Sequence, residues 1–285
     1  MSEPQRSRQA RALAEAALVR VVSAYGETPE FVLLGGLVPD LLCSEAARQH
    51  VGTTDVDVQV DLEIQAGVKN AARLEQALRS AEFEPSGEYA WRWKHQSVPG
   101  AVVKIEFLAD LSDSASQVTV IFDGSKALGA VNLRGTGFAS RDWQTHPLTA
   151  DVAGYPTTVE VRVATLPAYL LAKTHAAYGR GFEKDWYDMA YVVLHNDQGG
   201  PDAAAAQVRA VFATDLVGET TTALTELAAN FFDANAQGSL AYANTMNSLY
   251  PDLDADVLAN DAVAGITTFV SELNGRLTFQ GWSNS

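Results

Sequence analysis

The chain has 285 residues, of which 47% are hydrophobic and 19% are charged. This composition excludes a disordered or fibrous protein and is typical of one large globular domain or two joined ones. The N-terminal segment lacks the continuous apolar core of a signal peptide, and no stretch approaches ~18 uninterrupted apolar residues. We therefore expect a cytoplasmic protein without a membrane span. The single cysteine, Cys43, excludes an internal disulfide.

The formal net charge of −15 is unevenly distributed along the chain. Beyond residue 185 there are two basic and twelve acidic residues, whereas the first 185 residues carry 18 basic and 23 acidic residues. A uniformly acidic surface repels nucleic acid. We therefore expect an anionic substrate to dock on the N-terminal part of the chain and to avoid the C-terminal part.

The N-terminal third begins with a helix, predicted over residues 8–25 from apolar residues at helical spacing. A short apolar strand over residues 30–34 follows and ends in Gly35-Gly36, and a second helix is predicted over residues 37–48. Glycine lets the backbone approach a ligand closely, and the N-terminus of a helix is a natural phosphate site. The alternative is a simple turn. The chain has no Gly-x-x-x-x-Gly-Lys motif, which excludes a P-loop.

The clearest strand covers residues 55–62, DVDVQVDL, where polar and apolar residues alternate. A helix over residues 67–81 follows. Residues 89–95 and 101–109 are predicted as a pair of strands, joined by a turn that contains serine, proline and glycine. Trp91 and Trp93 share one face of the first of these strands with Tyr89, so they either stack on a base or pack against the sheet.

The remaining chain contains two more short strands, over residues 117–122 and 157–163, and becomes helical from Leu166 onward. Glycine and proline predict a loop over residues 196–201. The elements together predict a mixed α/β (α+β) domain followed by a largely helical one. We expect the first domain to cover residues 1–160 and the second to cover residues 161–285.

Asp55 and Asp57 are the first candidate site residues. Alternate residues of a strand point to the same side, about 7 Å apart, so both carboxylates can share one or two divalent cations. Mg²⁺ prefers oxygen ligands and often binds together with substrate phosphates, and a pair of metals ~3.5–4 Å apart supports in-line attack at phosphorus. The alternative is a strand with a solvated polar face.

A third carboxylate is expected from the segment VVKIEFLADL. Glu106 lies in the middle of this strand among apolar neighbours, where a carboxylate is costly unless it holds a cation. Asp110 is the reserve candidate. Lys104 could instead be the ion-pair partner of Glu106.

The segment LLAKTHAAYGRGFEKDWYDMAYVVL contains a basic pattern. On one helix, spacings of three and four place several polar residues on a single stripe. The stripe consists of Lys173, Ala176, Ala177, Arg180, Lys184 and Asp188. Its cations would meet triphosphate oxygens, with Asp185 or Asp188 orienting them or acting as a base, and the alternative is a surface helix with ion pairs. Gly179 and Gly181 indicate a local break.

Other catalytic arrangements find little support in the sequence. The five histidines do not have the spacing of metal ligands, and no Gly-x-Ser-x-Gly segment is present. His175 lies inside the basic segment and either contacts a nucleotide or packs.

With these motifs the sequence resembles the AbiEii-type nucleotidyltransferases, the toxins of type IV toxin–antitoxin systems, which include the MenT group and belong to the DNA polymerase β-like superfamily. The resemblance covers roughly residues 30–195. It rests on Gly35-Gly36 before a helix, on Thr54-Asp55-Val56-Asp57, on Lys104-Ile105-Glu106, and on the pattern Lys-x-x-Ala-x-x-x-Arg-x-x-x-(Arg/Lys)-Asp-x-x-Asp, matched by Lys173, Ala176, Arg180, Lys184, Asp185 and Asp188.

The resemblance implies a mixed sheet flanked by helices, then a helical domain, with the active site between them. It implies that Asp55 and Asp57 bind metal and are catalytic, with Glu106 as the third ligand of a two-metal Mg²⁺ site. The residues implied to bind nucleotide are Gly35, Gly36, Lys104, Lys173, Arg180 and Lys184. The catalytic set adds Lys173, Asp185 and Asp188. Many relatives in the superfamily have Gly-Ser where this chain has Gly-Gly, so only backbone amides are available at that position.

The implied activity is transfer of a nucleotide from a nucleoside triphosphate (NTP) to tRNA or another RNA, since several relatives target the 3′ end of tRNA, and the implied protein partner is an antitoxin. Two alternatives stay open. The acceptor could be a small molecule or a protein, which the acidic balance favours because RNA binding usually needs a basic surface. The chain could also be a degenerate, non-catalytic nucleotide-binding module, although all the expected carboxylates are present.

Overall fold

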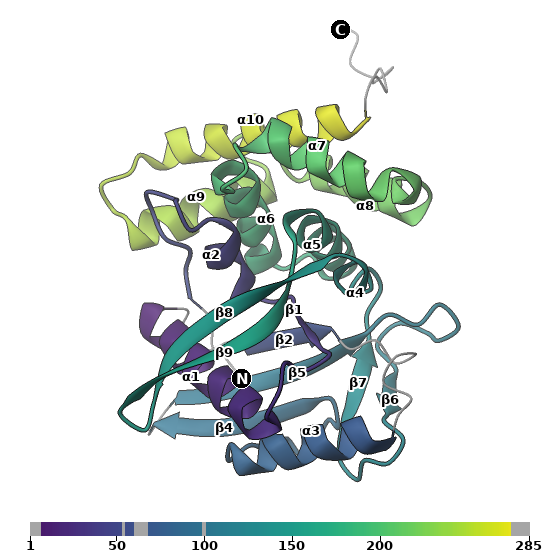
Figure 1. The fold of residues 1–285 in the computed structure, drawn as a ribbon. Helices are drawn as coiled ribbons and strands as arrows, with labels where there is room; N and C mark the ends of the chain where they lie inside the picture. Colours follow the sequence, from purple (N-terminus) through teal and green to yellow (C-terminus); the bar gives the residue numbers. More distant parts are fainter. Residues whose placement is uncertain (1–6, 53–54, 60–67, 99–100, 275–285) are drawn as a thin grey trace, which may run out of the picture. The chain divides into compact units, whose positions relative to one another are not determined.

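The computed structural model describes residues 7–52, 55–59, 68–98 and 101–274 (Figure 1). The chain forms two compact units. Unit 1 consists of residues 1–41 and 49–176, and unit 2 consists of residues 42–48 and 177–285. No helix among the described residues is long and apolar enough to cross a membrane.

Unit 1 is built on a mixed sheet, which has nine strands within the described residues. The order along the sheet is β3-β4-β5-β2-β1-β9-β8, and β7 pairs with both β5 and β6. The strands are β1 (Val32–Leu33), β2 (Asp55–Gln59), β3 (Glu84–Pro85), β4 (Arg92–Val98), β5 (Ala101–Ala109), β6 (Thr119–Ile121), β7 (Gly129–Asn132), β8 (Trp143–Val152) and β9 (Tyr155–Ala164). The expected fold class, a mixed sheet flanked by helices, is confirmed.

The centre of the sheet is the parallel pair β2 and β5. Their apolar residues alternate with polar ones, and Val56, Val58, Ile105 and Phe107 are fully buried. The helix α3 (Val68–Ser80) lies between the two strands in sequence and supplies the crossover that a parallel pair requires. The polar residues of both strands are thereby left on the opposite face.

The first helix, α1 (Arg8–Tyr25), has the bounds predicted from the sequence. The Ser7 hydroxyl accepts a hydrogen bond from the backbone N–H of Ala10, and Gly26 ends the helix with φ of 86°. Its buried face packs against α3 and several strands of the sheet. This helix therefore covers part of the core of unit 1, as Figure 1 shows.

The helix predicted over residues 37–48 is wrong in length. The helix α2 covers only Val38–Leu42. The Asp197 carboxylate accepts hydrogen bonds from the backbone N–H and hydroxyl of Ser44 and from the backbone N–H of Glu45. These donors are therefore directed to a side chain distant in sequence, and the segment does not continue as a helix.

Most predicted strands match observed ones with shifted ends, but β3, β7 and β8 were missed. The strand β8 pairs along its length with β9, and the turn between them has positive φ at Ala153 and Gly154. Most of its side chains are exposed or half-buried, so the strand carries little of the alternating pattern that identified β2. The last three residues of the strand predicted over 55–62, and Gly67 at the start of a predicted helix, lie outside the described residues.

Two further helices, α4 (Phe138–Arg141) and α5 (Leu166–Arg180), follow in chain order, and α5 runs from unit 1 into unit 2. Unit 2 is helical, as expected. Its other elements are α6 (Glu183–His195), α7 (Pro201–Phe212), a 3₁₀ turn (Ala213–Asp215), α8 (Glu219–Ala229), α9 (Gln237–Leu249) and α10 (Ala255–Asn274). The helix α6 packs against α9 and α10, and its Tyr187 stacks on Tyr242 of α9 with ring centroids 6.2 Å apart.

Glu75 of α3 binds the loop that precedes β7 through its carboxylate. Its carboxylate accepts hydrogen bonds from the Ser125 hydroxyl (2.7 Å), the backbone N–H of Lys126 (2.9 Å) and the Arg79 guanidinium (2.8 Å). Burial alone raises the pKa of Glu75, but these hydrogen bonds outweigh it and lower the pKa to about 2. A carboxylate with a depressed pKa stabilises the fold above its unfolded pKa, near 4.5, and loses that contribution as the pH falls toward 2.

We therefore expect Glu75→Gln to lower the free energy of unfolding at pH 7 by up to about 3 kcal/mol, and to lower it much less at pH 3. Urea denaturation of both proteins at the two pH values measures this difference. The exposed Glu84 of β3 provides the control, since Glu84→Gln should change neither value. An equal loss for Glu75→Gln at both pH values would contradict the assignment.

Candidate active site

Six charged residues form two rows across the strands β4, β5 and β2. The pairing registers place one residue of each strand in each row, and residues paired in this way share one face of the sheet. The rows are Arg92–Glu106–Asp57 and Lys94–Lys104–Asp55. Three cations and three carboxylates therefore lie together on the face opposite the buried valines of β2.

Ion pairs link the strands within each row. The Arg92 Nε donates to Glu106 Oε1 at 2.6 Å, and the Lys104 Nζ donates to Asp55 Oδ1 at 3.1 Å. The side chains of Glu106 and Asp55 are 16% and 25% exposed. The sequence left Lys104 as a possible partner of Glu106, and the structure instead pairs Glu106 with Arg92.

Glu106, in the middle of one row, has a strongly raised pKa. Burial, followed by the negative charge of Asp57, raises the pKa of Glu106 to about 7; Asp55 adds to the rise and the Arg92 guanidinium opposes it. Three carboxylates thus repel one another in a partly buried place. A bound cation would relieve this repulsion.

Gly35 gives Asp57 the space it needs. The backbone N–H groups of Leu34 and Gly35 donate to the Asp57 carbonyl at 2.9 and 3.3 Å. A Cβ on Gly35 would lie 2.1 Å from Asp57 Oδ2, so no other residue fits there while Asp57 keeps its place. The Gly35 N–H thus donates inside the protein, and its expected contact with a phosphate stays a prediction. The helix α2 has only five residues, so little dipole adds to the predicted phosphate contact of Gly36.

The donor set fits Mg²⁺ in its chemistry. Asp55, Asp57 and Glu106 offer only carboxylate oxygens, the ligands that Mg²⁺ prefers, and the charges of Asp57 and Asp55 add to the effect of burial in raising the pKa of Glu106. No group of three or more His, Cys, Asp or Glu side chains that could hold a metal ion occurs in the described part of the chain. Asp55 and Glu106 are directed toward Lys104 and Arg92, so metal binding requires these two carboxylates to turn.

Asp110, the reserve third carboxylate, has a structural contact. It accepts hydrogen bonds from the backbone N–H groups of Gly135 (2.8 Å) and Gly137 (3.2 Å). It thereby holds the loop that follows β7, which favours Glu106 as the third carboxylate of the site. Thr54, the first residue of the predicted Thr-Asp-x-Asp motif, lies outside the described residues.

The basic pattern of residues 173–188 does not lie on one helix. The helix α5 ends at Arg180, Gly181 has φ of 64°, and α6 begins at Glu183. The prediction of a single stripe is wrong, whereas the predicted break at a glycine is confirmed. Lys173 belongs to unit 1, where it is buried with its Nζ 5.9 Å from the centre of the Tyr169 ring.

The part of this pattern from Arg180 onward belongs to unit 2. The Arg180 guanidinium donates to Asp185 Oδ1 at 3.1 Å, which links α5 to α6 across the turn. Asp185 and Asp188 are fully buried. Arg180 and Lys184 both lie 5.8 Å from the ring of the exposed Phe182. The catalytic roles expected for Asp185 and Asp188 stay predictions.

Two members of the rows, Arg92 and Lys94, were missed in the sequence. The strands of residues 89–95 and 101–109 were predicted as a pair, but their register was not, and only the register places Arg92 opposite Glu106. Trp93 is fully buried, as the packing alternative expected.

The Trp91 ring, unlike the fully buried Trp93, packs on the Tyr89 ring with ring centroids 5.0 Å apart. His175 packs against Phe138, 5.7 Å between ring centres.

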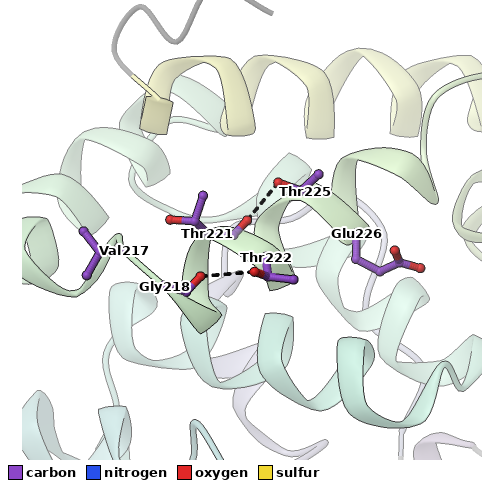
Figure 2. A pocket seen from close by; sticks show the side chains of 6 residues that line it. All are labelled: Val217, Gly218, Thr221, Thr222, Thr225 and Glu226. Carbon is purple, nitrogen blue, oxygen red and sulfur yellow. Dashed lines mark hydrogen bonds between the residues drawn. The ribbon is translucent and has the colours of Figure 1, made fainter. Parts of the chain in front are cut away.

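A shallow depression in unit 2 is not part of these rows (Figure 2). It is lined by Val217, Gly218, Thr221, Thr222, Thr225 and Glu226. The hydroxyls of Thr222 and Thr225 donate to the backbone carbonyls of Gly218 and Thr221. These two hydroxyls therefore serve the helix, and Glu226 supplies the one carboxylate in the lining.

Comparison with known proteins places the chain in a family. A family model described as the nucleotidyl transferase AbiEii toxin of type IV toxin–antitoxin systems matches residues 16–264, a range that includes both charged rows and the pattern of residues 173–188. No curated protein sequence matches the chain. The match covers most of the chain and confirms the resemblance drawn from the motifs. The chain therefore belongs to the AbiEii nucleotidyl transferase toxin family of type IV toxin–antitoxin systems.

Proposed function

We propose that this toxin transfers a nucleotidyl group from an NTP to tRNA, using Mg²⁺ held by Asp55, Asp57 and Glu106. The observation that carries the proposal is the gathering of these three carboxylates on the adjacent strands β2 and β5, with Glu106 largely buried and its pKa raised by its neighbours. A fold gains no stability from such repulsion, so the arrangement is best explained by a cation that binds there.

The reaction joins the acceptor to the α-phosphorus of the NTP. An acceptor hydroxyl attacks that phosphorus and releases its proton to water, a new P–O bond forms, and the bond to the β-phosphate breaks so that pyrophosphate leaves. Mg²⁺, when bound, neutralises charge on the phosphates and orients attacking and leaving oxygens. Asp55, Asp57 and Glu106 hold and position it. Lys104 stands beside Asp55 as a cation for the phosphates.

The pattern of residues 173–188 supplies further positive charge in this proposal. Lys173, Arg180 and Lys184 would contact triphosphate oxygens, as the family resemblance implies. Asp185 accepts a hydrogen bond from Arg180 and so fixes the direction of that guanidinium. Asp185 therefore acts on the nucleotide through Arg180, which deepens the earlier expectation that it orients the cations.

The acceptor is the least constrained part of the proposal. The family resemblance supports tRNA, and the family's type IV systems imply an antitoxin as the protein partner. The net charge of −15 favours the second candidate, a small molecule or a protein as acceptor, because it opposes RNA binding. A transfer assay separates the two. Purified protein and Mg²⁺ are incubated with each labelled NTP and total tRNA, and label on tRNA supports the first candidate. Nucleotide binding without labelled tRNA supports the second.

Asp57→Asn should reduce transfer by at least about 100-fold, because it removes a charged metal ligand while keeping the shape that packs against Gly35. The assay above measures the loss, and thermal melting checks the fold. Asp110→Asn is the matched control, since Asp110 holds a loop and should leave transfer near the wild-type rate. Full activity in a folded Asp57→Asn protein would refute the site, and loss of activity in a folded Asp110→Asn protein would refute the choice of Glu106.

Gly35→Ala should displace the Asp57 carboxylate, because the new Cβ would fall within 2.1 Å of Asp57 Oδ2. A displacement of about 1 Å at a reacting centre can cost roughly 100-fold in rate. We expect Mn²⁺ binding, measured by titration calorimetry, to weaken together with transfer. Gly179→Ala is the control, because nothing lies within 4 Å of its added Cβ. Unchanged Mn²⁺ affinity in Gly35→Ala would mean that Asp57 does not bind metal.

A further inference from the structure

Arg92 lies at the outer end of the row that contains Glu106 and Asp57. Its Nε donates to Glu106 Oε1 at 2.6 Å, and its side chain is 26% exposed. The guanidinium carbon lies 4.5 Å from the centre of the Trp91 ring and 5.4 Å from that of Tyr89. Arg92 thus contacts a carboxylate of the site through one nitrogen while two aromatic rings hold its plane.

The backbone that carries these rings is fixed by short-range hydrogen bonds. The Ser86 hydroxyl accepts from the backbone N–H of Tyr89 at 3.1 Å, and the Ser86 N–H donates to the Arg92 carbonyl at 2.9 Å. The Phe107 N–H donates to the Trp91 carbonyl at 2.9 Å, which ties the segment to β5. The guanidinium is therefore held beside the carboxylates even when its contact with Glu106 is broken, and it loses little side-chain freedom on binding a ligand.

The charges at the site indicate that the contact between Arg92 and Glu106 changes when substrate binds. Arg92 compensates the charge of Glu106, which stands beside Asp57 in the row. The same carboxylates would hold a divalent cation, whose charge would compensate theirs in place of Arg92 and would repel the guanidinium. The triphosphate that accompanies it brings several negative charges to the same face. A planar guanidinium with five N–H donors suits phosphate oxygens.

On the basis of the proposed function, we propose that Arg92 exchanges one hydrogen-bond partner for another. It leaves Glu106 when Mg²⁺ and NTP bind, and it then donates to a triphosphate oxygen. Arg92 is then a nucleotide-binding residue of this site, and its contact with Glu106 holds the carboxylate until the metal arrives. The aromatic pair of Tyr89 and Trp91 serves as the support on which the guanidinium turns.

The test compares two affinities in Arg92→Ala and Arg92→Lys. Calorimetry measures binding of Mn²⁺ alone, and then binding of each NTP with Mn²⁺ present. We expect Arg92→Ala to tighten Mn²⁺ several-fold, because a competing cation is removed, and to weaken the NTP by about 10- to 100-fold, the range for a hydrogen bond to a charged group. Arg92→Lys keeps the charge but not the planar donors, so its NTP affinity should lie between that of the wild-type protein and that of Arg92→Ala.

Arg79 offers a matched control. It contacts a glutamate, Glu75, at 2.8 Å and lies 5.2 Å from the ring centre of a tryptophan, Trp93, but outside the charged rows. Arg79→Ala should change neither affinity, and thermal melting checks the fold of each variant.

An exchange of partners predicts that Arg92→Ala raises the affinity for Mn²⁺ and lowers the affinity for NTP. These opposite changes distinguish it from a role in which Arg92 only supports Glu106. If Arg92 only supported Glu106, Arg92→Ala would weaken Mn²⁺ and NTP together, and the exchange would be refuted. Wild-type NTP affinity in Arg92→Ala, or in a folded Arg92→Lys if the alanine variant does not fold, would refute the exchange and leave the proposed function intact. A wild-type protein that binds no NTP with Mn²⁺ would overturn both.

Discussion

The parallel register between β2 and β5 is the constraint on which the site depends. It places Asp57 beside Glu106 and Asp55 beside Lys104, so carboxylates from segments about fifty residues apart share one face. The valines and Phe107 on the other face hold this register, because a shift by one residue would bury the carboxylates and expose the core. Hydrophobic packing of one face thus keeps the negatively charged Asp57 and Glu106 close together on the other face.

The sequence was most informative where a strand has one buried and one polar face. The alternation in residues 55–59 and 101–109 identified both central strands and Asp55, Asp57, Lys104 and Glu106. It could not give their neighbours, because strand pairing is a long-range property that local periodicity does not encode. Arg92 was therefore missed, although the strand that carries it was expected. The strand β8, largely exposed, has little alternation to detect.

Helix ends were likewise easier to predict where the residues that set them are close in sequence than where they are distant. The helix α1 was predicted with its true bounds from its apolar spacing, and in the structure Ser7 and Gly26 cap it locally. The helix after Gly36 was predicted too long, because the carboxylate that captures the following N–H groups comes from Asp197, far along the chain. The basic pattern was predicted to lie on one stripe with a local break at its glycines, and Gly181 turns the chain there and so divides the pattern between two helices. Family membership is confirmed by the match over residues 16–264, while the roles of individual site residues stay predictions.

The two charged rows hold as many cations as carboxylates, so the six side chains together carry no net charge when Glu106 is ionised. A polyanion approaching this face meets no excess positive field, and the chain as a whole is acidic. Long-range electrostatics therefore do not attract the nucleotide to this face, and the acidic chain repels it, so added salt, which screens this repulsion, should raise the rate of encounter. Selection among anions then takes place after contact, through short-range rearrangement of ion pairs rather than through diffusion.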